Sequence, residues 1–166
     1  MRKLIIILFC LISTLSFANH IDKMELRKQY YQSLDNKKLA DDFMFKMESI
    51  SVEHDALLLA YKGMAYFLEA NLSINPYAKY TYFKKGKSLL EEAVNKNPWN
   101  AEIRFMRFCV QTSAPKFLGY ISNIETDKYY LVEQWKGLND ADLKNKISNY
   151  MLTLSYFNDS QKINFK

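Results

Sequence analysis

The sequence predicts an all-α protein, in which about seven helices follow a signal peptide and stack as antiparallel hairpins. Glycine and proline are scarce, with 4 and 3 among 166 residues, whereas the turns of an all-β fold consume both. Residues 56–70 are apolar on nearly every side of a helix, as expected of a buried helix. In the segments around it, apolar residues recur every three or four positions. With 49% hydrophobic residues, the chain can bury one globular core.

The first 18 residues have the pattern of a cleaved signal peptide. A short basic segment precedes an apolar run over residues 4–17, and Ser16 and Ala18 place small residues where signal peptidase reads them. A membrane anchor is the weaker alternative, because this run of 14 residues is shorter than the roughly 20 that span a bilayer. We expect cleavage between Ala18 and Asn19, a periplasmic or secreted protein, and no stable membrane span in the mature chain.

Charge and cysteine content narrow the function of the mature chain. Without residues 1–18, Lys plus Arg falls from 23 to 21 while Asp plus Glu stays at 18, so the formal charge falls from +5 to +3. Such a weak positive charge does not indicate a nucleic-acid partner. Cys109 is then the one remaining cysteine, which leaves no internal disulfide. Its apolar neighbours predict a buried, inert thiol.

Two helices are predicted at the start of the mature chain, over residues 21–34 and 37–50, with a turn at Asp35 and Asn36. The second carries a helical stripe of apolar residues: Leu39, Phe43, Met47 and Ile50.

A central helix is predicted next, over residues 52–71. Its regular polar line consists of Asp55, Lys62 and Glu69 at steps of seven, so we expect one narrow edge to meet water. Asn75 is a good N-cap and Pro76 a good first helical residue for a fourth helix that ends near residue 95.

The remaining elements are predicted from caps and breakers. Asn100 caps a fifth helix that ends before Pro115, and residues 113–121 form a loop. Ser122 with Glu125 resembles a capping box, and Gly137 fits a C-cap, so these residues bracket a sixth helix. A seventh helix spans about 143–154. We expect one helical domain over 19–154 and an irregular tail over 155–166.

The central hairpin resembles a tetratricopeptide repeat, a pair of helices with small residues at fixed places and a proline that closes the unit. The residues that carry the resemblance are Gly63, Tyr66, Gly86, Leu90, Ala93, Pro98 and Asn100. Gly63 and Gly86 lie 23 residues apart, against about 12 in an ordinary repeat, which implies longer helices. The resemblance covers about 50 residues. It implies a helical protein similar to exported bacterial proteins of this kind, with Gly63 and Gly86 where the two helices cross closely, and it implies no catalytic residue.

One side of the fifth helix, together with the loop after it, is the strongest candidate for a binding surface. Paired arginines offer planar donors to a carboxylate or phosphate. The candidates are Arg104, Arg107, Gln111, Lys116 and Tyr120. The alternative is that the arginines form internal ion pairs with Glu91, Glu92 or Glu125.

Other polar groups suggest no chemistry of their own. His54 lies in an acidic first turn without a second histidine to share a metal, so a solvated side chain is the expected state. The tyrosines and lysines between Tyr77 and Lys87 suit a ligand surface, but tyrosines at helical spacing more often fill a core. The sequence contains no recognisable catalytic set, cofactor loop or metal-ligand cluster.

These observations favour an exported helical-repeat-like binding or scaffold protein that recognises a protein or peptide in the cell envelope. The alternatives are an envelope carrier of an apolar ligand and an enzyme with an unrecognised site. The surface distinguishes them: an open groove favours a peptide, an enclosed apolar cavity favours a carrier, and a pocket with perturbed titratable groups favours catalysis.

Overall fold

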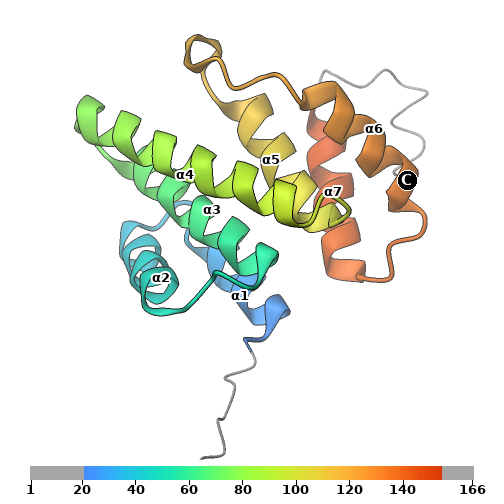
Figure 1. The fold of residues 1–166 in the computed structure, drawn as a ribbon, viewed down its shortest axis with the longest axis horizontal. Coiled ribbons are helices and arrows are strands. Elements are labelled where there is room, and N and C mark those ends of the chain that lie inside the picture. Colours follow the sequence, from blue (N-terminus) through green and yellow to red (C-terminus); the bar gives the residue numbers. More distant parts are fainter. Residues whose placement is uncertain (1–20, 155–166) are drawn as a thin grey trace, which may run out of the picture.

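A computed structural model describes residues 21–154 and shows an all-helical fold (Figure 1). Within this range the chain forms seven α-helices and one short 3₁₀ helix, with no β-strand, which confirms the predicted fold class. None of the helices in residues 21–154 is both long and apolar enough to cross a membrane. The predicted signal peptide and the predicted tail over 155–166 lie outside the described residues.

The first two helices begin where an acidic or amide side chain caps them. Helix α1 spans Lys23–Gln32 and α2 spans Lys37–Ser49. The Asp22 carboxylate accepts from the backbone N–H groups of Met24 and Glu25. The predicted turn provides the second cap, because the Asn36 side chain accepts from the backbone N–H of Leu39.

The two longest helices form the central hairpin: α3 spans Ala56–Leu72 and α4 spans Pro76–Lys96. Helix α4 starts as predicted, since the Asn75 side chain accepts from the first backbone N–H groups. Helix α3 starts four residues later than predicted, because Asp55 is its N-cap rather than an interior residue. The predicted solvent-exposed edge of this helix is also wrong, because α2 packs against it. Glu69 is 9% exposed, and Lys62 pairs with Glu48 of α2 at 3.0 Å.

The two glycines of the hairpin lie where α3 and α4 come closest, as predicted. A Cβ atom on Gly63 would lie 3.0 Å from the carbonyl oxygen of Gly86, and one on Gly86 would lie 2.9 Å from the carbonyl oxygen of Gly63. Each glycine therefore faces the backbone of the other helix. Backbones can approach this closely only where side chains are absent.

The C-terminal half consists of α5 (Ala101–Ser113), the 3₁₀ helix η1 (Lys116–Leu118), α6 (Ile124–Trp135) and α7 (Ala141–Thr153). The predicted capping box is wrong, because α6 begins one residue later with Asn123 as N-cap and no side-chain cap bond. The backbone N–H of Asn123 donates instead to the side chain of Gln111. Gly137 follows the end of α6 with ordinary negative φ; among the described residues, only Gly119 has positive φ, at 63°.

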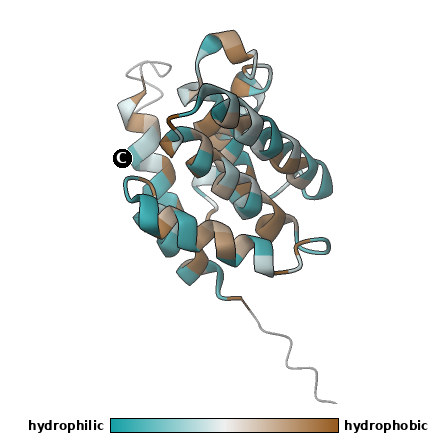
Figure 2. Ribbon diagram, turned by 90° about the vertical axis from the view of Figure 1, so that its left-hand side faces the viewer, coloured by the Kyte–Doolittle hydropathy of each residue, from teal (hydrophilic) through white to brown (hydrophobic). Residues whose placement is uncertain are grey.

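Helix α5 packs on two separate cores. Its residues Ile103, Met106 and Val110 face inward with α1 to α4. Phe105 and Phe108, on the other side of α5, pack with α6 and α7 in a second cluster. Figure 2 shows hydrophobic and hydrophilic residues alternating along the helices, as expected where each helix packs on neighbours and meets water elsewhere. Helix α5 therefore joins the two halves of the domain.

Candidate functional site: an apolar groove between α3, α4 and α5

An apolar groove with a volume of about 510 Å³ lies between α3, α4, α5 and the chain that follows α5. In Figure 1, α4 lies along α3, and after α5 the chain extends outward as a loop before it returns to α6. The floor of the groove is formed by buried side chains from three helices, together with the C-terminal end of α1. These floor residues are Met64, Leu68, Ala70, Phe83 and Val110.

The rim of the groove consists of exposed aromatic residues. Tyr80 on α4 is 53% exposed and Phe117 on η1 is 86% exposed. Pro115 ends α5, and the 3₁₀ turn is closed by a hydrogen bond of 3.0 Å from the Leu118 N–H to the Pro115 carbonyl oxygen. Gly119, with its positive φ, then redirects the chain toward α6. The loop therefore holds Phe117 beside the groove instead of in a core.

Burial favours the protonated forms of two titratable groups that line the groove. Burial raises the pKa of the Cys109 thiol and of the Tyr30 hydroxyl well above their ordinary values. The thiolate, not the thiol, is the nucleophile, so the raised pKa makes Cys109 react slowly at neutral pH; its side chain is half-buried rather than fully buried as predicted. Among the described residues that line the groove, Lys79 is the one basic residue, and none is Asp, Glu or His. The groove can bind apolar groups, but it offers no acid–base pair.

The predicted arginine flank forms an internal ion-pair network. Asp127 on α6 has no exposed surface. Arg107 donates to its two carboxylate oxygens at 2.7 and 2.8 Å, and Arg104 donates to one of them at 2.8 Å. Arg107 also donates to Glu91 at 2.9 Å. The alternative interpretation is thus the one that the contacts support, with Glu91 as a predicted partner and Asp127 as one that sequence reasoning missed.

The other members of the predicted surface have internal roles too, except one. Gln111 is 1% exposed and accepts from Asn123, and Tyr120 is 2% exposed and donates to Glu91 at 2.5 Å. Lys116 is exposed on η1. None of the five predicted residues lines the groove, although Lys116 lies between two residues that do.

The predicted partners Glu92 and Glu125 are not part of this network. Glu92 pairs with Lys96 at 3.2 Å, one turn along α4, and Glu125 pairs with Lys128 at 3.0 Å in the first turns of α6. Both are ordinary pairs on the surface of one helix. The arginines of α5 therefore pair with Glu91 of α4 and Asp127 of α6 instead.

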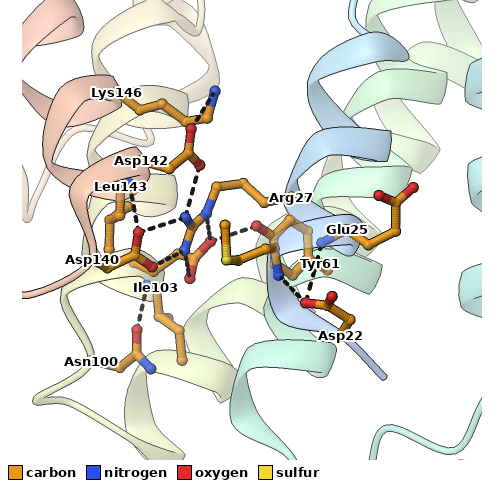
Figure 3. A network of polar contacts seen from close by, with 12 residues as sticks. Asp22, Glu25, Arg27, Tyr61, Asn100, Ile103, Asp140, Asp142, Leu143 and Lys146 are labelled. Carbon is orange, nitrogen blue, oxygen red and sulfur yellow. Dashed lines mark hydrogen bonds and ion pairs between the residues drawn. The ribbon is translucent and has the colours of Figure 1, made fainter. Parts of the chain in front are cut away.

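A second buried network, which sequence reasoning missed, is centred on Arg27 of α1 (Figure 3). Arg27 is 2% exposed and makes five hydrogen bonds to carboxylates. Two go to Glu102 of α5 at 2.7 and 2.9 Å, two to Asp140 at 2.7 and 3.0 Å, and one to Asp142 at 2.9 Å. Tyr61 of α3 donates to Glu102 at 2.5 Å.

The Arg27 network is a structural junction rather than a ligand site. A guanidinium group has five N–H donors, and the five hydrogen bonds of Arg27 use all of them. Its partners lie 75 to 115 residues further along the chain, so no local pattern could have predicted the cluster. The residues join α1, α3, α5 and α7 at one point.

The remaining candidates are unremarkable in their surroundings. Of the tyrosines on α4, Tyr80 lines the groove and Tyr77 is 80% exposed. Tyr82 packs on Tyr66, with the two ring centres 6.2 Å apart. Residues 21–154 contain no group of three or more His, Cys, Asp or Glu side chains arranged to hold a metal ion.

Comparisons with protein-family models, with curated proteins and with solved structures gave no match to this chain. The resemblance of the α3–α4 hairpin to a tetratricopeptide repeat therefore remains a prediction, and the function must be argued from the groove itself.

Proposed function

We propose that this protein is an exported, non-catalytic binding protein that holds an apolar ligand in the groove between α3, α4 and α5. The observation that carries the proposal is a buried apolar floor that opens to solvent through an exposed aromatic rim. The volume of about 510 Å³ lies within the range of about 300–1,000 Å³ that is typical of ligand pockets. Export rests on the signal-peptide pattern at residues 1–18.

The distribution of polar groups supports binding rather than catalysis. The buried arginines Arg27 and Arg107 lie in two networks. There they pair with the buried carboxylates of Glu102 and Asp127. The groove instead contains a protonated thiol and a protonated tyrosine. General acid–base catalysis most often uses His, Glu or Asp, and the described residues that line the groove include none of these.

A protein or peptide partner is the second candidate, because exposed apolar residues continue beyond the groove. Ile74, in the turn between α3 and α4, is 98% exposed, and Tyr77 is 80% exposed. Apolar side chains exposed next to a groove are typical of interaction surfaces. A small ligand is the better fit to the groove itself, since its floor is formed by side chains that are almost wholly buried.

Titration of the purified protein with N-phenyl-1-naphthylamine, a neutral dye that fluoresces in apolar surroundings, tests the proposal. We expect saturable binding at one site. Ser113→Trp, at an exposed lining residue of α5, should fill the groove and weaken dye binding at least tenfold. Ser88→Trp, at an exposed position on α4 that does not line the groove, is the matched control and should leave it unchanged.

A second measurement locates the dye. Maleimide labelling of Cys109, followed by mass spectrometry of the peptide, should slow when the dye is bound, because Cys109 lines the groove. No saturable dye binding, or equal binding by the two tryptophan variants, would refute the proposed function.

A further inference from the structure

We infer that the natural ligand of the groove is an anionic amphiphile, a long-chain carboxylate whose hydrocarbon chain lies on the floor and whose head group lies at Lys79 and Lys116. This inference rests on the proposed function and adds the chemical class of the ligand. It is carried by the exposed lysines on two walls of the groove.

The two walls of the groove come from stretches of chain without acidic residues. Residues 70–90, which form the end of α3 and most of α4, contain four lysines and no Asp or Glu. Residues 103–124, which form most of α5 and the loop after it, contain two arginines, one lysine and no Asp or Glu. The arginines are neutralised inside the network around Asp127. The lysines remain to set the potential at the mouth of the groove.

Lys79 and Lys116 are placed to meet a negative head group. Lys79 lines the groove from α4, and Lys116 lies on η1 between the lining residues Pro115 and Phe117. Both lysines are exposed, and neither has a carboxylate of the described chain within ion-pair distance. A third lysine lies on the same wall: the Lys84 Nζ atom is 5.7 Å from the ring centre of Tyr80, an aromatic residue of the rim.

Two carboxylates neighbour lining residues in the sequence. Glu69 lies in α3, is 9% exposed, and is held by Lys37 from α2 at 3.3 Å. Asp35 is exposed and follows the lining residue Leu34 in the turn between α1 and α2, outside the two segments that carry the lysines. The groove is therefore basic on the α4 and η1 walls and apolar on its floor.

This arrangement suits a molecule that is apolar along its length and negative at one end. The floor takes the hydrocarbon chain out of water, which supplies most of the affinity. The head group stays hydrated beside exposed ammonium groups, so each pair adds little, about a factor of two to five. The charges thus decide between ligands of equal chain length rather than create binding by themselves.

Displacement of N-phenyl-1-naphthylamine by three probes of the same chain length tests the inference: oleate, oleyl alcohol and oleylamine, each below its aggregation limit. We expect oleate to bind about tenfold more tightly than oleyl alcohol, and oleylamine to bind most weakly. The preference for oleate should shrink as salt is raised, because exposed charges are screened, while binding of the alcohol should not change in parallel.

Charge reversal identifies the lysines. In Lys79→Glu combined with Lys116→Glu, oleate should lose its preference over oleyl alcohol, and dye binding should persist. The matched control is Lys23→Glu combined with Lys136→Glu, two exposed lysines outside the groove, which changes the net charge equally and should keep the preference.

Three results would overturn the inference: equal affinities for oleate and oleyl alcohol, an equal loss of preference in the control variant, or displacement of the dye by an acidic amphipathic peptide but not by oleate. In the first two the dye still binds in the groove and the proposed function survives, whereas displacement by the peptide alone would favour the second candidate, a protein or peptide partner. Absence of saturable dye binding would instead refute the proposed function.

Discussion

Removal of the Arg27 side chain should be among the most damaging single changes in this protein. Arg27→Met keeps an apolar stem of similar length but removes all five hydrogen bonds to Glu102, Asp140 and Asp142. The variant strands the carboxylate of Glu102 in the interior, with Tyr61 as its remaining donor.

The size of the effect follows from how deeply each partner is buried. The side chains of Arg27 and Glu102 are 2% and 8% exposed, and breaking such a buried pair costs about 3–5 kcal/mol. Asp140 and Asp142 are 38% and 45% exposed, so each adds only about 0–1 kcal/mol after screening by water. We therefore expect a loss of about 3–5 kcal/mol, nearly all of it from Glu102.

Urea unfolding at pH 7 measures this loss, provided that the slopes of parent and variant agree. Lys28→Met is the matched control, since Lys28 is the next residue of α1, is 63% exposed and pairs with Glu25 at 3.5 Å. Its cost should stay below about 1 kcal/mol.

A second substitution checks the physical reason. Adding Glu102→Gln to Arg27→Met removes the stranded charge and should restore at least about 1 kcal/mol. The reasoning is refuted if Arg27→Met costs no more than the Lys28 control, or if the Glu102 substitution makes the variant still less stable.

Four further predictions concern the second charge network, the helix crossing at Gly63, the acid dependence of stability and the start of the exported protein. Arg107→Ala should cost more than about 1.5 kcal/mol in urea unfolding, because it leaves Asp127 buried with one partner fewer; a smaller loss would contradict the network role. Gly63→Leu should lower the free energy of unfolding by at least about 1–3 kcal/mol, since its Cβ would meet α4 backbone. The Arg27 hydrogen bonds lower the pKa of Asp140, so its contribution to stability is present above the unfolded value of about 4 and lost as pH falls further. Asp140→Asn should therefore weaken the acid dependence of stability, measured as melting temperature against pH. Mass spectrometry of the exported protein should show Asn19 as its first residue, and an intact Met1 would contradict export by this signal.

The Gly63 prediction has an internal control. Gly137 follows α6 with negative φ, and a Cβ there would come no closer than 3.7 Å to the carbonyl oxygen of Gln134. Gly137→Ala should therefore be neutral or stabilise by about 0.4–1 kcal/mol. If Gly137→Ala lowers the free energy of unfolding as much as Gly63→Leu does, the close approach of α3 and α4 is not what makes Gly63 necessary.

The helices could be predicted because the signals that start them are local. Asn75 with Pro76, and Asn100 further on, cap α4 and α5 where the sequence placed those starts. The predictions failed where two local signals competed. Asp55 is compatible both with the interior of an apolar helix and with its N-cap, and in the structure it caps α3. Ser122 offered a capping box, but the Gln111 side chain from α5 takes the N–H of Asn123 instead.

The groove and the charge networks could not be predicted because they depend on contacts between distant residues. Arg27, Glu102 and Asp140 lie on different helices, and each alone resembles an ordinary surface residue of an amphipathic helix. The groove is lined both by the α3–α4 hairpin and by the chain after α5, including Pro115, Phe117 and Leu118, so it depends on segments that are distant in the sequence. Sequence reasoning found the loop and weighed ion pairs for the arginines, but it had no means to place Asp127 beside them.

The double role of α5 also determines what a growing chain exposes during synthesis, when N-terminal segments emerge first. Once Ser113 has left the ribosome, α1 to α5 can close their shared core, yet Phe105 and Phe108 still lack the neighbours that cover them. Leu131 and Ile147, which complete that cover, arrive up to 34 residues later. For that interval the nascent chain carries an aromatic stripe on an otherwise formed helix, which is the kind of surface that molecular chaperones bind and that promotes aggregation when it is left uncovered.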